Sequence, residues 1–189
     1  MAMRRDRRSQ PRHQERSEFD RKLLDVRRVA RVVAGGRRFS FRATVVIGNR
    51  RGKVGVGVAK GQDVSIAQEK AVARARKGII LVPITKDGSI AHEVRAKYAA
   101  ARVILRPRPV GSGIIAGGAV RAVVELAGIT NCSGKIVSRT PNKLTNAMAT
   151  LEALAELTKG RAVRSPAAAR PDETPTQTTP PPAGEPASA

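Results

Sequence analysis

The side chains of this sequence best suited to chemistry are arginines and lysines placed among glycines. Between Gly35 and Gly61, apolar residues alternate with small or cationic ones, and no acid interrupts the run. Glycine leaves the backbone bare for close approach, and the planar guanidinium group of arginine binds phosphate through paired hydrogen bonds. This predicts that an RNA backbone is bound in and around two β-turns, by Arg27, Arg28, Arg31, Arg37, Arg38, Arg42, Arg50, Arg51, Lys53 and Lys60, with Gly35, Gly36, Gly55 and Gly57.

The sequence has few of the side chains that catalysis requires. Cys132 is the one cysteine, and the two histidines are His13 and His92. Residues 91–160 contain no aspartate and only a few glutamates. General acid–base, nucleophilic and metal-assisted mechanisms need paired groups of these types. We therefore predict no enzymatic activity, no catalytic residue, no bound metal, no cofactor and no small-molecule substrate.

A glycine-rich segment at residues 111–118 precedes a predicted helix. Free N–H groups at a helix N-terminus bind phosphate, but the spacing matches neither the dinucleotide-binding fingerprint nor the Walker loop. The segment is similar to the phosphate loop of the GHMP small-molecule kinases, whose essential carboxylates have no counterpart here. Its expected uses are tight turning, contact with a ribose-phosphate chain through Gly111 and Gly113, or contact with a neighbouring protein.

The formal net charge of +21 and the isoelectric point near 11.7 are extreme. Because so many like charges repel one another in the folded state, they indicate a polyanionic partner. Nucleic acid is the first candidate, an anionic membrane surface the second, and a merely solvated basic surface the third. Scarce aromatic residues favour recognition of RNA backbone and shape over base stacking; they are Phe19, Phe39, Phe41 and Tyr98.

Both ends of the chain differ in composition from its middle. Residues 1–20 are rich in arginine and are typical of a disordered basic arm, whereas residues 161–189 are rich in proline and alanine and predict a flexible tail. The first twenty residues lack the apolar core of a signal peptide, and no stretch approaches the roughly twenty apolar residues of a membrane span. We expect a soluble, cytoplasmic protein.

Residues 21–89 are expected to form a first domain, a β-sheet with one helix. The polarity pattern predicts strands over residues 24–33, 39–45 and 54–59, with a turn at Gly35 and Gly36 and a hairpin loop over residues 48–52. Phe39, Phe41 and the valines are expected in the core. A helix is predicted from an N-cap at Asp63 to a stop at Gly78.

Two features of this first domain leave alternatives open. Gly55, Gly57 and Ala59 share one face of the third strand, and such a bare face admits either a packed helix or RNA. The predicted helix carries a basic stripe that we interpret as a solvated face; it comprises Lys70, Arg74 and Lys77 with Ile66.

Residues 90–160 are expected to form a second, α/β domain. Strands are predicted over residues 93–97, 102–105 and 132–137, with helices over residues 119–127 and from Thr140, the predicted N-cap, to near Gly160. An apolar stripe on the last helix places both helices on one face of the sheet.

Three motifs resemble a known family. They are Gly35-Gly36-Arg37-x-Phe39-Ser40-Phe41, the Val-Gly-x-Gly-x-x-Lys run at residues 54–60, and Gly-x-Gly-Ile-Ile-Ala-Gly-Gly-Ala at residues 111–119. In this order they resemble the bacterial small-subunit ribosomal protein S five family over about residues 20–158. The sequence departs from the family at Val56 and Val58, where aromatics are frequent, at residues 99–101, and at the start of the last helix.

The resemblance implies an α+β fold: a double-stranded-RNA-binding-like domain, then a left-handed βαβ domain shared with the GHMP kinases. It implies a structural constituent of the small (30S) ribosomal subunit that binds 16S ribosomal RNA, contacts proteins S four and S eight, lies near S three on the mRNA entry path, and influences decoding accuracy. The competing hypothesis is a free RNA chaperone with the same domains. By family match, spectinomycin-resistance changes fall on Ala30, Arg31, Ala34, Gly35 and Gly36. Arg102 is a further predicted RNA-binding residue.

Overall fold

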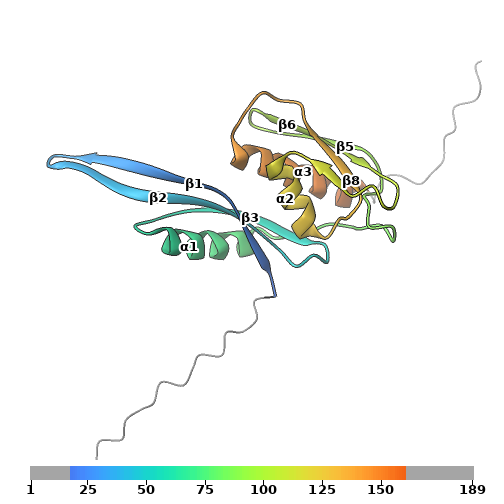
Figure 1. The fold of residues 1–189 in the computed structure, drawn as a ribbon, viewed down its shortest axis with the longest axis horizontal. Coiled ribbons are helices and arrows are strands. Elements are labelled where there is room, and N and C mark those ends of the chain that lie inside the picture. The colour runs from blue at the N-terminus through green and yellow to red at the C-terminus, as the bar shows by residue number, and fades with distance from the viewer. Residues whose placement is uncertain (1–17, 161–189) are drawn as a thin grey trace, which may run out of the picture.

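A computed structural model describes residues 18–160, which form two α+β domains (Figure 1). This confirms the predicted fold class of two small domains that mix sheets and helices. The predicted tail at residues 161–189, and all but the last three residues of the predicted arm at residues 1–20, lie outside the described residues.

The first domain is built on an antiparallel sheet of order β1-β2-β3-β4. The strands are β1 (Asp20–Val33), β2 (Gly36–Gly48), β3 (Lys53–Gly61) and the short β4 (Ile80–Leu81). The three predicted strands are confirmed, and each is longer than expected. β1 and β2 make a long hairpin whose tip extends well past the single helix of this domain (Figure 1).

Helix α1 (Val64–Lys77) covers one face of this sheet by packing on bare glycine backbone. Its small side chains Ala67, Ala71 and Ala75 are buried. A Cβ added to Gly57 would overlap the carbonyl oxygen of Ala71, and one added to Gly55 would lie 2.7 Å from that of Ala75. The two alternatives for this face are thus resolved in favour of the helix. Gly55 and Gly57 are buried, and our assignment of them to an RNA-binding surface is wrong.

The prediction that Phe39 lies in the core is also wrong. Phe39 is 48% exposed, whereas Val45 and Ile47 are fully buried. Phe39 is exposed because the hairpin is long, and Phe39 lies in the half of it that extends beyond α1. From Ala43 to Gly48, by contrast, strand β2 is buried on both faces.

The second domain contains a mixed sheet of order β5-β6-β8-β7. Its strands are β5 (Val94–Tyr98), β6 (Ala101–Pro107), β7 (Ile114–Ala116) and β8 (Cys132–Ile136). Helix α2 (Gly118–Ala127) connects β7 to the parallel strand β8, and helix α3 (Lys143–Gly160) packs beside α2 against β5 and β6 (Figure 1). Both helices share one face, as predicted. Strand β7 lies inside the glycine-rich segment that we had expected to be a loop.

Helix α3 begins later than the sequence predicted. Its N-cap is Asn142, whose side-chain Oδ1 accepts a hydrogen bond from the Leu144 N–H (3.1 Å). Thr140, the predicted cap, instead accepts a bond from the Asn142 N–H (3.4 Å) and thereby shapes the turn before the helix. An asparagine at this position satisfies one of the free N–H groups of the first helical turn.

Helix α2 joins the two domains. Its buried residues Val120 and Val124 share one hydrophobic cluster with Val46 and Val54 of the first sheet. The loop between β2 and β3 also caps the C-terminus of α2, because the N–H groups of Arg50 and Gly52 donate to the carbonyl oxygens of Leu126 (3.0 Å) and Ala127 (2.8 Å). Carbonyls that would end the helix unpaired are satisfied by the other domain.

The contact between α1 and the glycine face makes a testable prediction about stability. Gly57→Ala should lower the free energy of unfolding by about 2 kcal/mol, because the new methyl group must push α1 off the sheet. Chemical denaturation measures the loss. Gly35→Ala is the matched control: a Cβ there meets nothing within 4 Å, so its stability should stay within about 0.5 kcal/mol of the parent. Equal stability of the two variants would contradict the packing described here.

Candidate nucleic-acid interface

The face of the first sheet opposite α1 is lined with cations where it extends beyond α2, toward the hairpin tip. In the strand register, Arg27 of β1 pairs with Arg42 of β2, and Arg42 pairs with Lys60 of β3. Directly paired residues point to the same face of a sheet. Arg31 and Arg38 form a second cross-strand pair four residues closer to the hairpin tip on that face. We call these five residues the first basic face: Arg27, Arg31, Arg38, Arg42 and Lys60.

Such an arrangement is unfavourable in an isolated protein. Like charges placed directly opposite one another across strands repel and cost stability. Asp25 pairs with Arg27, but no ion pair among residues 18–160 involves the other four cations, so an anionic surface over the face would balance their charge. The register therefore brings together five of the cations that the sequence marked as binding residues.

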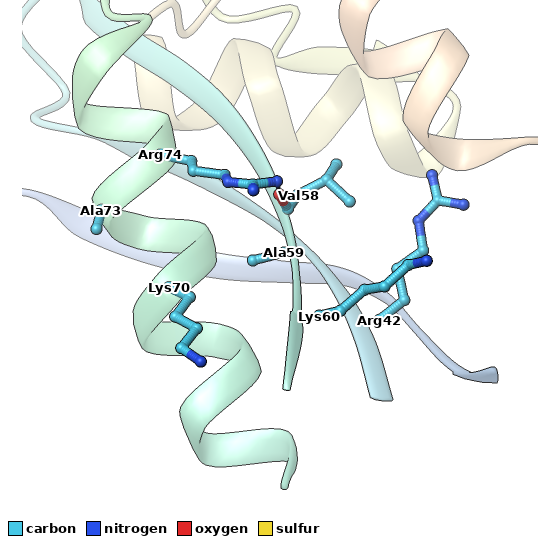
Figure 2. A pocket seen from close by; sticks show the side chains of 7 residues that line it. All are labelled: Arg42, Val58, Ala59, Lys60, Lys70, Ala73 and Arg74. Carbon is cyan, nitrogen blue, oxygen red and sulfur yellow. Dashed lines mark hydrogen bonds between the residues drawn. The ribbon is translucent and has the colours of Figure 1, made fainter. Parts of the chain in front are cut away.

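A groove follows the free edge of β3 beside this face (Figure 2). Strand β4 pairs with β3 only at Lys53 and Val54, so the rest of that edge is open. The groove encloses about 650 Å³ and has cations on both sides, with Lys70 and Arg74 from α1 facing Arg42 and Lys60 from the sheet. Lysines 60 and 70 also line the adjoining hollow.

Sequence reasoning missed Lys70 and Arg74, which we had interpreted as a solvated helix face. Arg74 reaches across the groove, and its Nη1 donates to the carbonyl oxygen of Val58 at 2.9 Å (Figure 2). This bond satisfies an edge carbonyl of β3 and fixes the guanidinium group at the rim. The helical spacing of the basic stripe was a usable signal, but the sequence did not show that the stripe borders an open strand edge.

The hairpin tip carries the glycines and arginines predicted there. Gly35 and Gly36 are exposed, and Gly36 has φ +136°, a conformation that favours glycine. Arg37 points to the opposite face from Arg38. Arg28 lies with its guanidinium carbon 3.6 Å from the centre of the Phe39 ring, a cation–π contact that covers part of the exposed ring.

The two basic turns lie at opposite ends of the first sheet. The β2–β3 loop lies at the end of the sheet opposite the hairpin tip and packs against α2. There Arg50 pairs with Asp20 (3.0 Å) and Lys53 lies 3.8 Å from Glu18. Arg51 is exposed in the same loop.

The remaining predicted residues lie in the second domain. Arg102 is exposed on β6. Gly111 and Gly113 precede β7 with φ of +87° and +69°, and neither has a neighbour within 4 Å of an added Cβ. They turn the chain in the open, apart from the first basic face.

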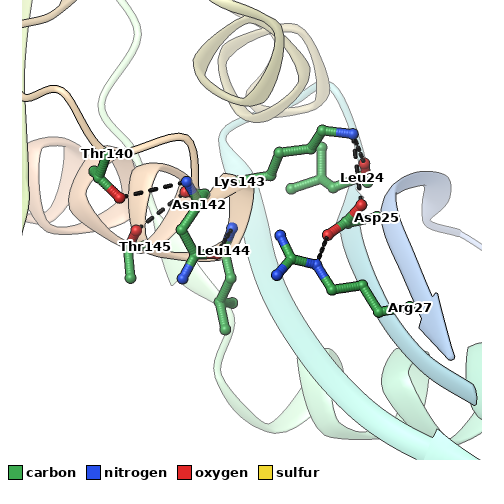
Figure 3. Close-up of polar contacts among 8 residues, drawn as sticks. All are labelled: Leu24, Asp25, Arg27, Thr140, Asn142, Lys143, Leu144 and Thr145. Carbon is green, nitrogen blue, oxygen red and sulfur yellow. Dashed lines mark hydrogen bonds and ion pairs between the residues drawn. The ribbon is translucent and has the colours of Figure 1, made fainter. Parts of the chain in front are cut away.

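A small polar network joins the first basic face to helix α3 (Figure 3). Asp25 accepts a hydrogen bond from Nε of Arg27 at 2.7 Å, and its other oxygen lies 3.6 Å from Nζ of Lys143. Lys143 also donates to the carbonyl oxygen of Leu24 at 3.2 Å. The hydrogen bond from Arg27, helped by the charges of Arg27 and Lys143, holds the pKa of Asp25 below its ordinary value. Asp25 thereby orients Arg27 and offsets the placement of a lysine at a helix N-terminus.

Other kinds of site find little support. Between residues 18 and 160, no three histidine, cysteine or acidic side chains gather where they could hold a metal ion. Burial raises the pKa of the Cys132 thiol to about 11, so it is not a thiolate at neutral pH. No helix in this part of the chain is long and apolar enough to cross a membrane.

The fold and its surface define a two-domain α+β protein in which basic residues line sheet surface that no helix covers. Two family models match it in chain order: "Ribosomal protein S5, N-terminal domain" over residues 19–83 and "Ribosomal protein S5, C-terminal domain" over residues 96–165. The chain therefore belongs to the ribosomal protein S5 family. This confirms the resemblance found in the sequence and, with it, the prediction of a non-enzymatic protein.

Curated relatives agree with the family models. The chain is 50% identical to the small ribosomal subunit protein uS5 of Thermosynechococcus vestitus over 153 residues, covering 80% of this chain and 87% of the relative. It is 48% identical to the uS5 proteins of Acaryochloris marina, covering 80% and 86% of the two chains, and of Thermotoga neapolitana, covering 77% and 81%.

The Asp25 network predicts a pH-dependent stability difference. Because the folded-state pKa of Asp25 lies below its ordinary value of 3.8, its contribution is complete above that pH and is lost as pH falls through the folded-state pKa. Asp25→Asn should lower the free energy of unfolding at neutral pH by at most about 1 kcal/mol, as expected for a partly exposed ion pair.

Urea denaturation at pH 7 and in acid measures this difference. It should shrink toward zero in acid, where the parent also loses the charge. Glu152→Gln, at an exposed position of α3, is the control and should change stability little at either pH. A deficit of Asp25→Asn that persists undiminished in acid would contradict the role assigned to the carboxylate.

Proposed function

We propose that this protein is a structural constituent of the small ribosomal subunit and that it binds 16S ribosomal RNA through the first basic face and the edge groove of β3. The observation that carries the proposal is the row Arg27–Arg42–Lys60, three cations side by side on three strands. Repulsion within such a row is relieved when phosphates lie over it. The relatives are named as small ribosomal subunit proteins, and their names support the proposal that this protein meets the RNA within the small subunit.

The chemistry of the surface fits the RNA backbone better than RNA bases. The groove is lined by four cations and three aliphatic side chains, with no ring on which a base could stack. Arginine binds phosphate oxygens in pairs, while lysine acts as a compact charge. Binding of this kind reads the shape and charge of a folded RNA and depends strongly on salt.

Finer parts of the proposal rest on the family resemblance. We propose contacts with proteins S four and S eight, a position near S three on the mRNA entry path, an influence on decoding accuracy, and a place in cytoplasmic ribosomes. Residues matched to the family's spectinomycin-resistance loop lie at the hairpin tip, which protrudes from the sheet (Figure 1). Domain boundaries at residues 21–89 and 90–160 remain part of this proposal.

Removal of cations from the groove tests the RNA-binding role. The triple variant Arg42→Gln, Lys60→Gln, Lys70→Gln should bind transcribed 16S ribosomal RNA more weakly than the parent. The slope of log affinity against log salt should also become shallower by about 2, because a variant that makes fewer phosphate contacts releases fewer counterions when it binds. Filter binding over a series of potassium chloride concentrations measures both quantities.

The control removes the same charge elsewhere. A variant with glutamine in place of Arg161, Arg164 and Arg170 should keep an affinity and a salt slope close to those of the parent. Equal losses in the two triple variants would show that binding follows net charge alone and would refute the groove as the site.

A further inference from the structure

The second sheet has one face that no helix of the described residues covers. Helices α2 and α3 lie against the other face, where Val94, Ala96, Ala101, Val103 and Leu105 are buried. The alternating residues of the same strands are exposed or half-buried. Five of them are cations, which we call the second basic face: Arg95 and Lys97 of β5, Arg102 and Arg106 of β6, and Lys135 of β8.

The strand register brings these cations close together. Lys97 pairs directly with Arg102, and Ile104 lies between Arg95 on one neighbouring strand and Lys135 on the other. Paired residues on adjacent strands lie about 5 Å apart, so the cations form a continuous field across three strands.

One acid offsets part of this field. Glu93, just before β5, pairs with Arg95 (2.9 Å) and with Arg106 (2.8 Å), and hydrogen bonding from Arg95 lowers its pKa. It fixes two guanidinium groups at one end of the face. Among residues 18–160, no ion pair involves Lys97, Arg102 or Lys135. Three charges thus remain to be balanced from outside the protein.

The chemistry of the face selects a phosphate backbone as its occupant. Sheets that bind single strands through their bases present aromatic rings for stacking, but Tyr98 falls on the helix side of β5, and none of the residues named on this face is aromatic. Its apolar side chains are Ile104, the 53% exposed Ile115 and, just past β8 and opposite Arg102, the 54% exposed Val137, which are too few for an obligate protein interface. Charge complementarity therefore favours RNA over a protein.

We propose that the second basic face is a separate docking surface for the ribose-phosphate backbone of RNA. The proposal rests on the proposed function in that RNA is the ligand, but it uses none of the residues of the first basic face. Because the two domains share one core through α2, both faces are held on one rigid body. Two surfaces on a rigid body bind one folded RNA with a higher effective concentration at the second contact.

The test removes the three unpaired cations in the full chain. The triple variant Lys97→Gln, Arg102→Gln, Lys135→Gln should bind transcribed 16S ribosomal RNA at least tenfold more weakly at low salt, and its salt slope should become shallower by about 2. Glutamine replacement of Arg161, Arg164 and Arg170 removes equal charge and should leave both quantities near those of the parent. Lys97→Arg with Lys135→Arg keeps the charge and should bind like the parent.

Several results would overturn the proposal. If the face variant keeps a parental unfolding midpoint and binds RNA like the parent, the face is not an RNA site. If RNA binding is intact but incorporation into small subunits is reduced, the face serves an acidic protein instead. If the groove variant described above loses affinity and the face variant does not, the proposed function stands and only this inference fails. If neither variant loses affinity, both fail.

Discussion

The close approach of helix α1 to the glycines of β3 is the contact on which the rest of the molecule depends. Small alanines on the helix meet bare backbone on the strand, so that Gly57 has no room for a side chain beneath Ala71. This contact assigns one face of the first sheet to the protein core. It therefore leaves the alternate residues of the same strands, Arg42 and Lys60 among them, on the outside.

The same division recurs in the second domain, and α2 links the two. In each sheet, helices of the same domain cover one face, and cations line the part of the other face that no helix covers. The β2–β3 loop, which looked like a second RNA-binding turn, uses the backbone of Arg50 and Gly52 to complete the C-terminus of α2. A glycine is needed there because the loop comes so close that a Cβ on Gly48 would overlap the Leu126 carbonyl group. The basic faces are consequently positioned by the packing between the domains.

Local patterns in the sequence predicted most helices and strands, because the alternation of a strand and the end of a helix depend on residues that are neighbours in the sequence. They failed where distant segments decide the outcome. The sequence could not show what lies on Gly55 and Gly57, nor that the hairpin would carry Phe39 beyond α1. Thr140 and Asn142 are both good caps, and their residue types do not show which of them begins the helix. The alternation of Arg95 and Lys97 with apolar residues was visible in the sequence. Only the positions of α2 and α3 show that these two cations lie on the uncovered face of the sheet.

The central claim is that RNA meets the two basic faces and the edge groove of β3 rather than the other exposed cations of the protein. Lysine acylation followed by mass spectrometry, on the full chain with and without transcribed 16S ribosomal RNA, tests it position by position. The account predicts that RNA protects Lys60 on the first basic face and Lys97 and Lys135 on the second, while the exposed Lys77 at the end of α1 and Lys86 in the connecting loop stay reactive. Protection of Lys77 and Lys86, with Lys60, Lys97 and Lys135 still reactive, would contradict it.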